Sequence, residues 1–332
     1  MKSDGYDGSY LSLTAEEIEI LAELTKMRGE GEIDRIVVIL NTAAIFETAF
    51  LDDDWTVETD TGTYTVDVDA CLWAGNVGIG GISALADALA GEVVPSGRIP
   101  DTYVKDNFSA PATASWILSN SAGTFSAQYE GSDQLSSAAQ YYYGVYTEGI
   151  YVGYRYYETR YEDVVLGREG AGDYSYTDTV SRPFGYGLSY TTFDYSDFAV
   201  SETEDGNFEV SVTVTNTGDT AGKEVVQIYL QKPYTDYDIE TGVEKAAVEL
   251  VGFDKTDVLE SGASQTLTIE VERESLKTYD TNGYGTYILE EGWPPARTRT
   301  RRSTTSWPGR GRPRRTGWTR TATRRWPPSS TR

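Results

Sequence analysis

Residues 208–216 read FEVSVTVTN, and this strict alternation of apolar and polar side chains decides the fold of the second half of the chain. The apolar members, at every second position from Phe208 to Val214, share one face of an extended strand, because successive side chains point to opposite sides of a sheet. The polar run NTGD at residues 216–219 then predicts a turn. This stretch therefore predicts an antiparallel strand with one buried face.

Two further stretches repeat the pattern downstream. Residues 224–230 (EVVQIYL) predict the next strand, and Leu267, Ile269 and Val271 alternate again with polar residues. Strands at this spacing over about a hundred residues are typical of an immunoglobulin-like β-sandwich. The sequence therefore predicts an all-β domain at residues 191–292.

The first hundred residues have an α/β pattern. Residues 14–17 (TAEE) read as a capping box, in which a hydroxyl and a carboxylate three residues later begin a helix. Residues 35–40 (RIVVIL) and 69–73 (DACLW) are short apolar runs, typical of strands buried on both faces of a parallel sheet. A helix is predicted at residues 82–89, and the turn PSGRIP at residues 95–100 leads into one more strand.

Two candidate ligand-contacting residues follow these strands. Asn41 lies at the carboxyl end of the first strand, where open α/β sheets place ligands. Trp73 precedes the glycine-rich turn at residues 75–81, and it either stacks on a sugar ring or packs in a core. The glycine turn lacks a complete dinucleotide fingerprint and a Gly-Lys-Ser/Thr signature, so a tight strand-to-helix turn is favoured over a phosphate site.

An aromatic stretch lies between the two patterns. Residues 146–158 (YTEGIYVGYRYYE) and 182–193 (RPFGYGLSYTTF) are dense in tyrosine and glycine. Such composition suits a rigid, hydrogen-bonded seam between domains. Glu148 and Arg155 are candidate ligand contacts, although a buried interdomain ion pair is the favoured interpretation of both.

Composition narrows the class of protein. The chain has 332 residues, 39% of them hydrophobic, and 25 tyrosines, which predicts a folded core. Cys71 is the single cysteine, so an internal disulfide is excluded, and the absence of histidine excludes a Ser-His-Asp triad or a His-ligated zinc within this chain. No apolar run reaches membrane-spanning length, and no signal peptide is recognised. Localisation stays open between the bacterial cytoplasm and secretion.

The last forty residues have a different composition from the rest. Twelve of the 28 basic residues lie at residues 293–332, which contain no Asp or Glu, so the first 292 residues carry 16 basic and 52 acidic side chains. A tail of Arg, Pro, Trp, Thr and Ser is what GC-rich DNA encodes when it is read out of frame, and this is the favoured interpretation. The alternative is a basic arm that contacts phosphates, but the acidic body would repel nucleic acid.

Four strings in combination resemble the C-terminal part of glycoside hydrolase family 3, the β-glucosidase and β-xylosidase family. The resemblance covers nearly all of residues 10–292. The strings are a strand ending in VVILN, the LW-to-DTY segment with PSGR near its end, EGIYVGYRYYET and PFGYGLSYTTF. They lie at residues 37–41, 72–103, 148–159 and 183–193.

The resemblance implies a fold and a domain organisation. An α/β sandwich domain, incomplete at its N-terminus, is expected at residues 1–190, with residues 139–190 as its interdomain aromatic segment. A fibronectin type III-like domain without its last strand is expected at residues 191–292. Residues 293–332 are expected to form a disordered basic tail. The fold class is therefore α/β followed by all-β.

The family's catalytic residues are expected outside this chain. The resemblance implies an Asp nucleophile on a (β/α)8 barrel and a Glu acid/base, usually in a Gly-Glu-Gly string upstream of the matching segment. Glu30 stands in such a string but between the capped helix and the strand at residues 35–40, so we interpret it as a solvated loop residue and only a weak catalytic candidate. The chain is thus expected to be the accessory part of a retaining β-glycosidase, inactive by itself.

Other functional classes remain open at this point. The chain is alternatively a carbohydrate-binding module that uses Trp73 and the tyrosines as stacking platforms, or an acidic surface-adhesion module without hydrolase activity. The expected partners are an oligosaccharide or aryl glycoside and the missing barrel. We expect no cofactor, metal, nucleic acid or membrane partner. Sugar, linkage and oligomeric state are not specified by the sequence.

The origin of the basic tail is directly testable at the nucleotide level. We expect the DNA after codon 292 to encode, in a shifted frame, an acidic and Ala-rich sequence like the body, because the hairpin-like run at residues 284–292 stops in mid-pattern. Sequencing this region, together with the DNA upstream of codon 1, is the measurement. A continuous frame that encodes the arginines in independent isolates of the gene contradicts the frameshift.

Overall fold

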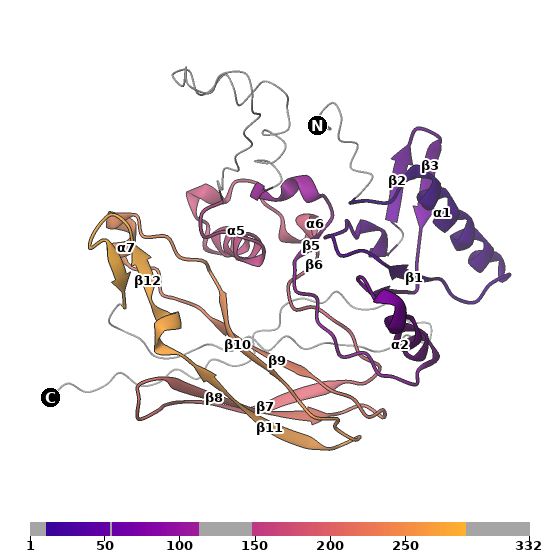
Figure 1. Cartoon of the computed structure of the whole chain (residues 1–332). Helices are drawn as coiled ribbons and strands as arrows, with labels where there is room; N and C mark the ends of the chain where they lie inside the picture. Colours follow the sequence, from indigo (N-terminus) through magenta and orange to yellow (C-terminus); the bar gives the residue numbers. More distant parts are fainter. Residues whose placement is uncertain (1–10, 54, 113–147, 290–332) are drawn as a thin grey trace, which may run out of the picture. The chain divides into compact units, whose positions relative to one another are not determined.

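The computed structural model describes residues 11–53, 55–112 and 148–289, and it divides the chain into two compact units (Figure 1). The first unit holds residues up to Ala90 together with Ile99–Tyr186, and the second holds Gly91–Arg98 together with the residues from Gly187 onward. The basic tail, and residues 139–147 of the aromatic segment, lie outside the described residues. In the part that is described, no helix is both long and apolar enough to cross a membrane.

The first unit is α/β. Three 3-10 turns interrupt it, at Ala49–Leu51, Asn107–Ser109 and Glu169–Ala171. Its helices and strands are α1 (Ala15–Glu30), β1 (Val37–Leu40), β2 (Trp55–Thr59), β3 (Gly62–Val66), β4 (Ala70–Trp73), α2 (Gly78–Ala90), β5 (Tyr103–Val104), α5 (Tyr154–Leu166), α6 (Tyr176–Thr179) and β6 (Val180–Arg182).

Helix α1 begins and ends at the residues that local chemistry favours. The hydroxyl of Thr14 accepts from the Glu17 amide at 3.2 Å, and the Glu17 carboxylate accepts from the Thr14 amide at 2.9 Å, so the predicted capping box is confirmed. Gly31 ends the helix in the left-handed conformation, with φ of 81°. Ile18 and Leu21 are buried and pack with Leu40 of β1.

Strands β1 and β4 pair in parallel, in a register that places Leu40 opposite Trp73. The predicted strands and their α/β context are thus confirmed, but burial on both faces is not. Val37 and Ile39 are 45% and 39% exposed, because α1 and its core cover one face of this two-stranded sheet and the described residues leave the other open.

The glycine-rich turn is shorter than predicted. Helix α2 begins at Gly78, so the glycines at 78, 80 and 81 lie inside its first turn, and Gly91 follows it with φ of 80°. The antiparallel hairpin β2–β3, which carries Trp55 to Val66, was not predicted. Its polar tip and short strands lack a long alternating pattern.

The second unit is a β-sandwich. It contains β7 (Phe193–Glu202), β8 (Phe208–Asn216), β9 (Val225–Leu230), α7 (Asp236–Thr241), β10 (Glu249–Lys255), β11 (Ser264–Val271), a 3-10 turn at Arg273–Leu276, β12 (Thr278–Asp280) and β13 (Thr286–Ile288). One sheet has the order β11-β8-β7, a second pairs β10 with β9, and β12 and β13 form a separate hairpin. All these pairs are antiparallel. The predicted strands are confirmed.

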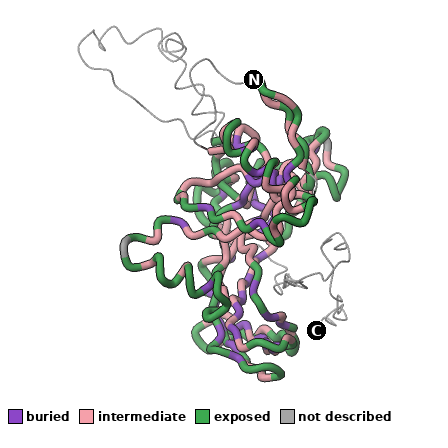
Figure 2. Tube along the Cα trace, turned by 90° about the vertical axis from the view of Figure 1, so that its right-hand side faces the viewer, coloured by how far each residue is buried: buried purple, intermediate pink, exposed green. Residues whose placement is uncertain are grey.

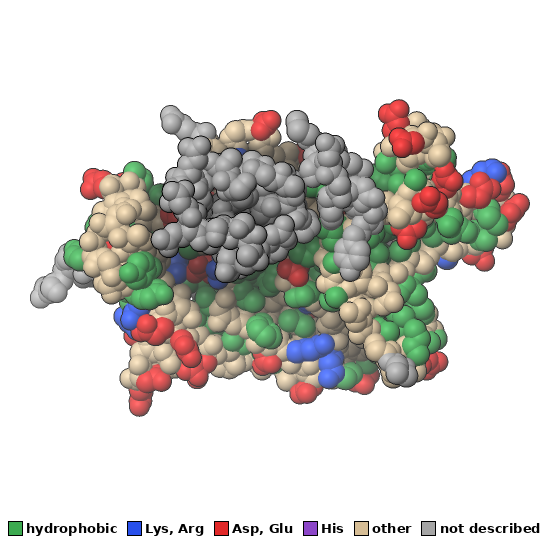
Figure 3. Space-filling model, turned by 45° about the horizontal axis from the view of Figure 1, so that its top comes forward, with side chains coloured by type: hydrophobic (Ala, Val, Ile, Leu, Met, Phe, Trp, Pro, Cys, Tyr) green, Lys and Arg blue, Asp and Glu red, His purple; other side chains and the backbone are tan. Residues whose placement is uncertain are grey.

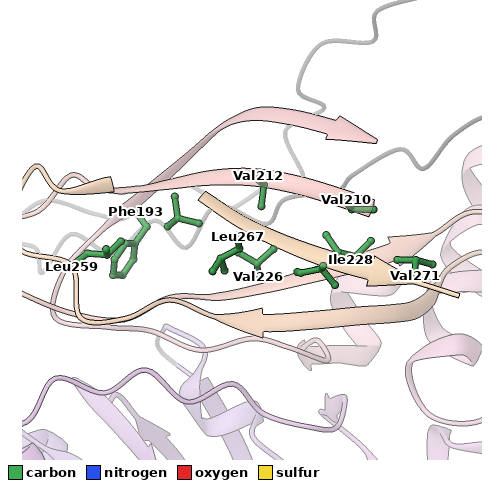
Figure 4. Close-up of a cluster of buried hydrophobic side chains, with 10 residues drawn as sticks. Phe193, Val210, Val212, Val226, Ile228, Leu259, Leu267 and Val271 are labelled. Atoms are coloured by element: carbon green, nitrogen blue, oxygen red, sulfur yellow. The ribbon is translucent and has the colours of Figure 1, made fainter. Parts of the chain in front are cut away.

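The sandwich core lies between the two sheets. Every second residue of β8 from Val210, and of β9 from Val226, is buried. Figure 2 shows buried and exposed residues interspersed along the chain. Figure 4 shows side chains of β8, β9 and β11 directed toward one another in this core. Its members include Val210, Val212, Val226, Ile228, Leu267 and Val271.

A buried ion pair ties residues 91–98 to the sandwich. The Arg98 guanidinium donates to both Glu224 carboxylate oxygens, at 2.6 and 2.5 Å, and the two side chains are 8% and 4% exposed. Arg98 also donates to the Gly187 carbonyl, and the Tyr195 hydroxyl donates to Glu224 at 2.7 Å. Burial, and then the charge of Glu224, raises the pKa of Tyr195. The predicted PSGR turn therefore supplies a charged anchor to the second unit.

The Asp280 carboxylate holds the turn of the hairpin β12–β13. Asp280 is fully buried and accepts from the Tyr237 hydroxyl at 2.5 Å and from the Gly283 and Tyr284 amides at 2.7 and 2.8 Å. These hydrogen bonds, led by the one from Tyr237, hold the pKa of Asp280 below its usual value. The predicted terminal hairpin is confirmed up to Leu289, the last described residue of the chain.

The sandwich core sets the stability of the second unit. Replacing Ile228, which is 1% exposed, with alanine is expected to lower the free energy of unfolding by about 2–5 kcal/mol, because it leaves a cavity. The matched control is Val258→Ala, at a 55% exposed position, which is expected to change it by less than about 0.5 kcal/mol. Urea unfolding followed by circular dichroism measures both, and equal losses contradict the assignment of the core.

Candidate functional site

The carboxyl edge of the β1–β4 pair brings together two of the four predicted binding residues. The parallel register aligns Leu40 with Trp73, and the Ala74 amide donates to the Leu40 carbonyl at 2.9 Å. Asn41, the next residue, is exposed, and Trp73 is 37% exposed. Parallel strands end at one edge of a sheet, so the pairing places Asn41 and Trp73 at the same edge.

The Trp73 ring is held in one orientation. Its indole N–H donates to the Thr42 carbonyl at 2.8 Å, which ties β4 to the loop after β1. Gly75, with φ of 59°, lies beside the ring, and a Cβ there would be 3.5 Å from Trp73 Cζ2. A partly exposed indole with a satisfied N–H offers an apolar face of fixed direction. Such a ring suits stacking against a flat, amphipathic ligand.

The electrostatics of this edge favour binding over proton transfer. Burial raises the pKa of the Cys71 thiol to about 12, against a small opposing effect of Arg182. Burial, followed by the charge of Asp101, likewise raises the pKa of Tyr103 to about 12. Both groups therefore stay neutral at physiological pH, and neither serves as a base there. The described residues contain no group of three or more His, Cys, Asp or Glu side chains arranged to hold a metal.

Glu148 and Arg155 lie elsewhere in the first unit. Arg155 is in the first turn of α5, and Glu148 forms the turn before it, where its carbonyl accepts from the Tyr151 amide at 2.9 Å. Within the described residues no ion pair joins Glu148 to Arg155, and no hydrogen bond joins either one to Asn41 or Trp73. Glu148 Oε2 and Arg155 Nε are buried without a hydrogen-bond partner there. A ligand contact by these side chains stays a prediction.

Glu30 is the last residue of α1 and is exposed. The sequence predicted a loop there, but helix α1 continues through Glu30 and ends at the left-handed Gly31. A solvated carboxylate at a helix end lacks the enclosed surroundings that a glycosidic acid/base requires. Glu30 therefore remains a weak catalytic candidate.

The aromatic segment contains a helix that the sequence did not reveal. In α5, Tyr157 and Glu158 are buried, and the Tyr176 hydroxyl donates to Glu158 Oε1 at 2.6 Å. Arg160 donates to the Ala171 carbonyl at 2.7 Å and lies over the Tyr174 ring, 5.5 Å from its centroid. The spacing of the tyrosines at 154, 157 and 161 is a helical signal, obscured by the density of aromatic residues.

Comparison with known families matches most of the chain to two domains. Residues 1–154 match the glycosyl hydrolase family 3 C-terminal domain, and residues 224–293 match a fibronectin type III-like domain. The sandwich strands β7 and β8 precede the second match.

Several of the similar whole proteins are β-glucosidases, and others are exo-alpha-(1->6)-L-arabinopyranosidases of Bifidobacterium breve and Bifidobacterium longum. The chain is 33% identical over 276 residues to a beta-glucosidase of Ruminococcus albus, covering 83% of this chain and 22% of the relative. It is 32% identical over 288 residues to beta-glucosidase A of Butyrivibrio fibrisolvens, covering 81% of this chain and 28% of the relative. The chain thus spans less than a third of the length of these relatives.

Solved structures of β-glucosidases also superpose on most of this chain. A beta-glucosidase of Paenibacillus barengoltzii superposes with a TM-score of 0.59 at 30% identity, covering 84% of this chain and 25% of that one. Beta-glucosidase 3B of Thermotoga neapolitana, in complex with glucose, superposes with a TM-score of 0.57 at 27% identity, covering 81% of this chain and 30% of that one.

The buried thiol in β4 reports on the integrity of this edge. Because burial raises the pKa of Cys71 to about 12, the reactive thiolate is scarce at pH 8 in the folded chain and more abundant in the unfolded one. Alkylation by iodoacetamide is expected to be about tenfold or more slower in buffer than in urea. The rate is expected to rise steadily up to about pH 12. Equal rates in buffer and urea contradict the buried placement of β4.

Proposed function

Because the chain belongs to glycosyl hydrolase family 3, over the family's C-terminal domain and a fibronectin type III-like domain, we propose that it is the accessory, non-barrel part of a retaining β-glycosidase. In the complete enzyme it acts with a (β/α)8 barrel on terminal β-linked glucose or xylose in oligosaccharides or aryl glycosides. The chain by itself is inactive. The observation that carries this proposal is the partly exposed Trp73, held by the Thr42 carbonyl at the edge of a family-3 α/β domain.

The chemistry of retaining hydrolysis supports inactivity of this chain alone. Such hydrolysis needs a nucleophilic carboxylate and an acid/base carboxylate about 5 Å apart across the scissile bond. The β1–β4 edge offers an amide and an indole, which bind and orient a sugar but do not transfer a proton. The nucleophile Asp and the acid/base Glu are therefore expected on the rest of the enzyme.

Uncovered apolar surface supports a missing neighbour for the first unit. Val37 and Ile39 on β1 are 45% and 39% exposed, and Ile82 and Leu89 on α2 are 60% and 47% exposed. Helix α2 is rich in Ala, Ile and Leu, yet among its residues whose burial is described only Ala88 is buried. Apolar faces of this kind mark surfaces that another domain covers. The barrel is the occupant that we propose for them.

Surface charge is consistent with a neutral substrate. Figure 3 shows many acidic and few basic side chains over the visible face. The net charge of −24 disfavours anionic partners and leaves neutral sugars unaffected. The glucose complex of the Thermotoga neapolitana enzyme shows that a relative binds such a sugar. In this chain, Trp73 is the proposed stacking wall and Asn41 a proposed hydrogen-bonding group.

The second candidate function is a carbohydrate-binding or surface-adhesion module without hydrolase activity. The fixed, exposed ring of Trp73 favours the carbohydrate-binding form. The two functions predict different cellobiose binding by the chain alone. A binding module binds cellobiose by itself through Trp73, whereas an accessory domain needs the barrel to complete its sugar site.

The activity test uses the purified chain with 4-nitrophenyl β-glucoside and β-xyloside. We expect no turnover above the uncatalysed rate, because both reacting carboxylates lie elsewhere. Calorimetry with cellobiose tests the alternative that the chain is a carbohydrate-binding module. It is carried out on the chain and on its Trp73→Ala and Trp73→Phe variants. Release of nitrophenol that survives repurification contradicts the accessory role. Cellobiose affinity that is lost in Trp73→Ala and kept in Trp73→Phe identifies a binding module instead.

A further inference from the structure

The second unit has a hollow of about 350 Å³ that the proposed function does not use. It is lined by residues 189–192, just before β7, and by residues 218–220, in the turn after β8. Its size lies at the small end of the range for ligand pockets, about 300–1,000 Å³. The hollow therefore has room for one small ligand.

The two loops that form the hollow are held by a buried asparagine. The Asn216 carbonyl oxygen accepts from the Thr191 hydroxyl at 2.7 Å and from the Gly218 amide at 3.1 Å. Its amide nitrogen donates to the Thr220 carbonyl at 2.9 Å and to the Leu259 carbonyl at 2.7 Å. Asn216 is fully buried, so these bonds are shielded from water.

Backbone contacts and a glycine complete the frame of the hollow. The Thr217 amide donates to the Thr192 carbonyl at 2.8 Å, and the hydroxyls of these two threonines lie 2.9 Å apart. A Cβ at Gly218 would stand 2.3 Å from the Thr191 hydroxyl oxygen, so only glycine permits the approach of the loops. The backbones of the two loops are thus held together before any ligand arrives, which lowers the entropic cost of binding.

The lining is chemically suited to a neutral, hydroxylated molecule. Ser189 is 5% exposed, and its hydroxyl has no hydrogen-bond partner among the described residues. Asp219 and Thr220 expose a carboxylate and a hydroxyl, and Tyr190 is 42% exposed. No Lys or Arg lines the hollow, and the single carboxylate repels anions. Hydroxyls, one carboxylate and an aromatic ring are groups that pair with the hydroxyls and the apolar face of a sugar.

We propose that this hollow is a binding site for a single neutral sugar residue, separate in the chain from the Trp73 edge. Asp219 accepts hydrogen bonds from the ligand's hydroxyls, Thr220 exchanges hydrogen bonds with them, and the Tyr190 ring faces the sugar's carbon skeleton. The Ser189 hydroxyl supplies a further donor to a ligand that reaches the base of the hollow. The site goes beyond the proposed function, since it requires neither the barrel nor hydrolysis.

The test is sugar binding by the full chain, with D-glucose, D-xylose and cellobiose as the probes. Calorimetry is expected to show weak, saturable binding of at least one sugar. Nuclear magnetic resonance is expected to show shifts of the amides at residues 189–192 and 218–220. Both Asp219→Ala and Ser189→Ala are expected to weaken binding about tenfold or more, because each removes a hydrogen-bonding group from the ligand.

Matched controls separate this site from the Trp73 edge and from misfolding. Asp194→Ala removes another exposed carboxylate of the second unit, on β7, and is expected to leave affinity unchanged. Trp73→Ala reports on the other edge of the chain: sugar binding that this variant abolishes belongs to Trp73 and overturns the proposal for the hollow, so the two proposals fail in distinguishable ways. No saturable binding of any of the three sugars overturns the proposal. So does binding that survives both Asp219→Ala and Ser189→Ala.

Discussion

The second unit depends on one buried ion pair, between Arg98 and Glu224. A guanidinium and a carboxylate that are almost fully removed from water are tolerated only when each is paired and hydrogen-bonded, because the unpaired charge is strongly destabilising. Here the carboxylate also accepts from Tyr195 of β7, and the guanidinium also donates to the Gly187 carbonyl. The pair therefore joins residues before β7, residues of β7 and the start of β9. Removing either partner leaves the other charge buried alone.

The same constraint explains two glycines of the connecting segments. A Cβ at Gly187 would lie 2.4 Å from the Gly97 carbonyl oxygen and 2.9 Å from Arg98 Nη1, so a side chain there would displace the guanidinium. A Cβ at Gly222, which pairs with Leu259 in an isolated bridge, would lie 2.8 Å from Thr191 Cγ2. Both glycines allow backbone to approach a packed side chain. Close packing at Gly222 thus constrains the loop at residues 189–192.

The two units differ in the chemistry that they offer. The first presents a pinned indole, an exposed amide and apolar faces on β1 and α2 that lack a cover within the described residues. The second is a β-sandwich with a buried apolar core and a hydroxyl-lined hollow at one pair of loops. This division suits an accessory role, in which the α/β unit borders the sugar site of the complete enzyme and the sandwich supplies a stable support. The proposed sugar site in the hollow adds a ligand contact that is independent of hydrolysis.

The sequence by itself determined the elements whose period is local. The alternation from Phe208 to Val214 and the Thr14–Glu17 capping box predicted a strand and a helix start, because a pleat or a first turn is encoded within a few residues. The strings shared with the family indicated the domains, and the apolar runs at residues 35–40 and 69–73 predicted β1 and β4. Only the tertiary structure decided which face of β1 is open, how the Trp73 ring is held, and that Arg98 pairs with Glu224. It also decided that residues 189–192 meet residues 218–220 around Asn216. The hydrogen bonds that decide these features join residues that are 25 to 126 positions apart in the chain. The exposure of β1 depends on which other segments cover it. A local sequence pattern encodes neither kind of information.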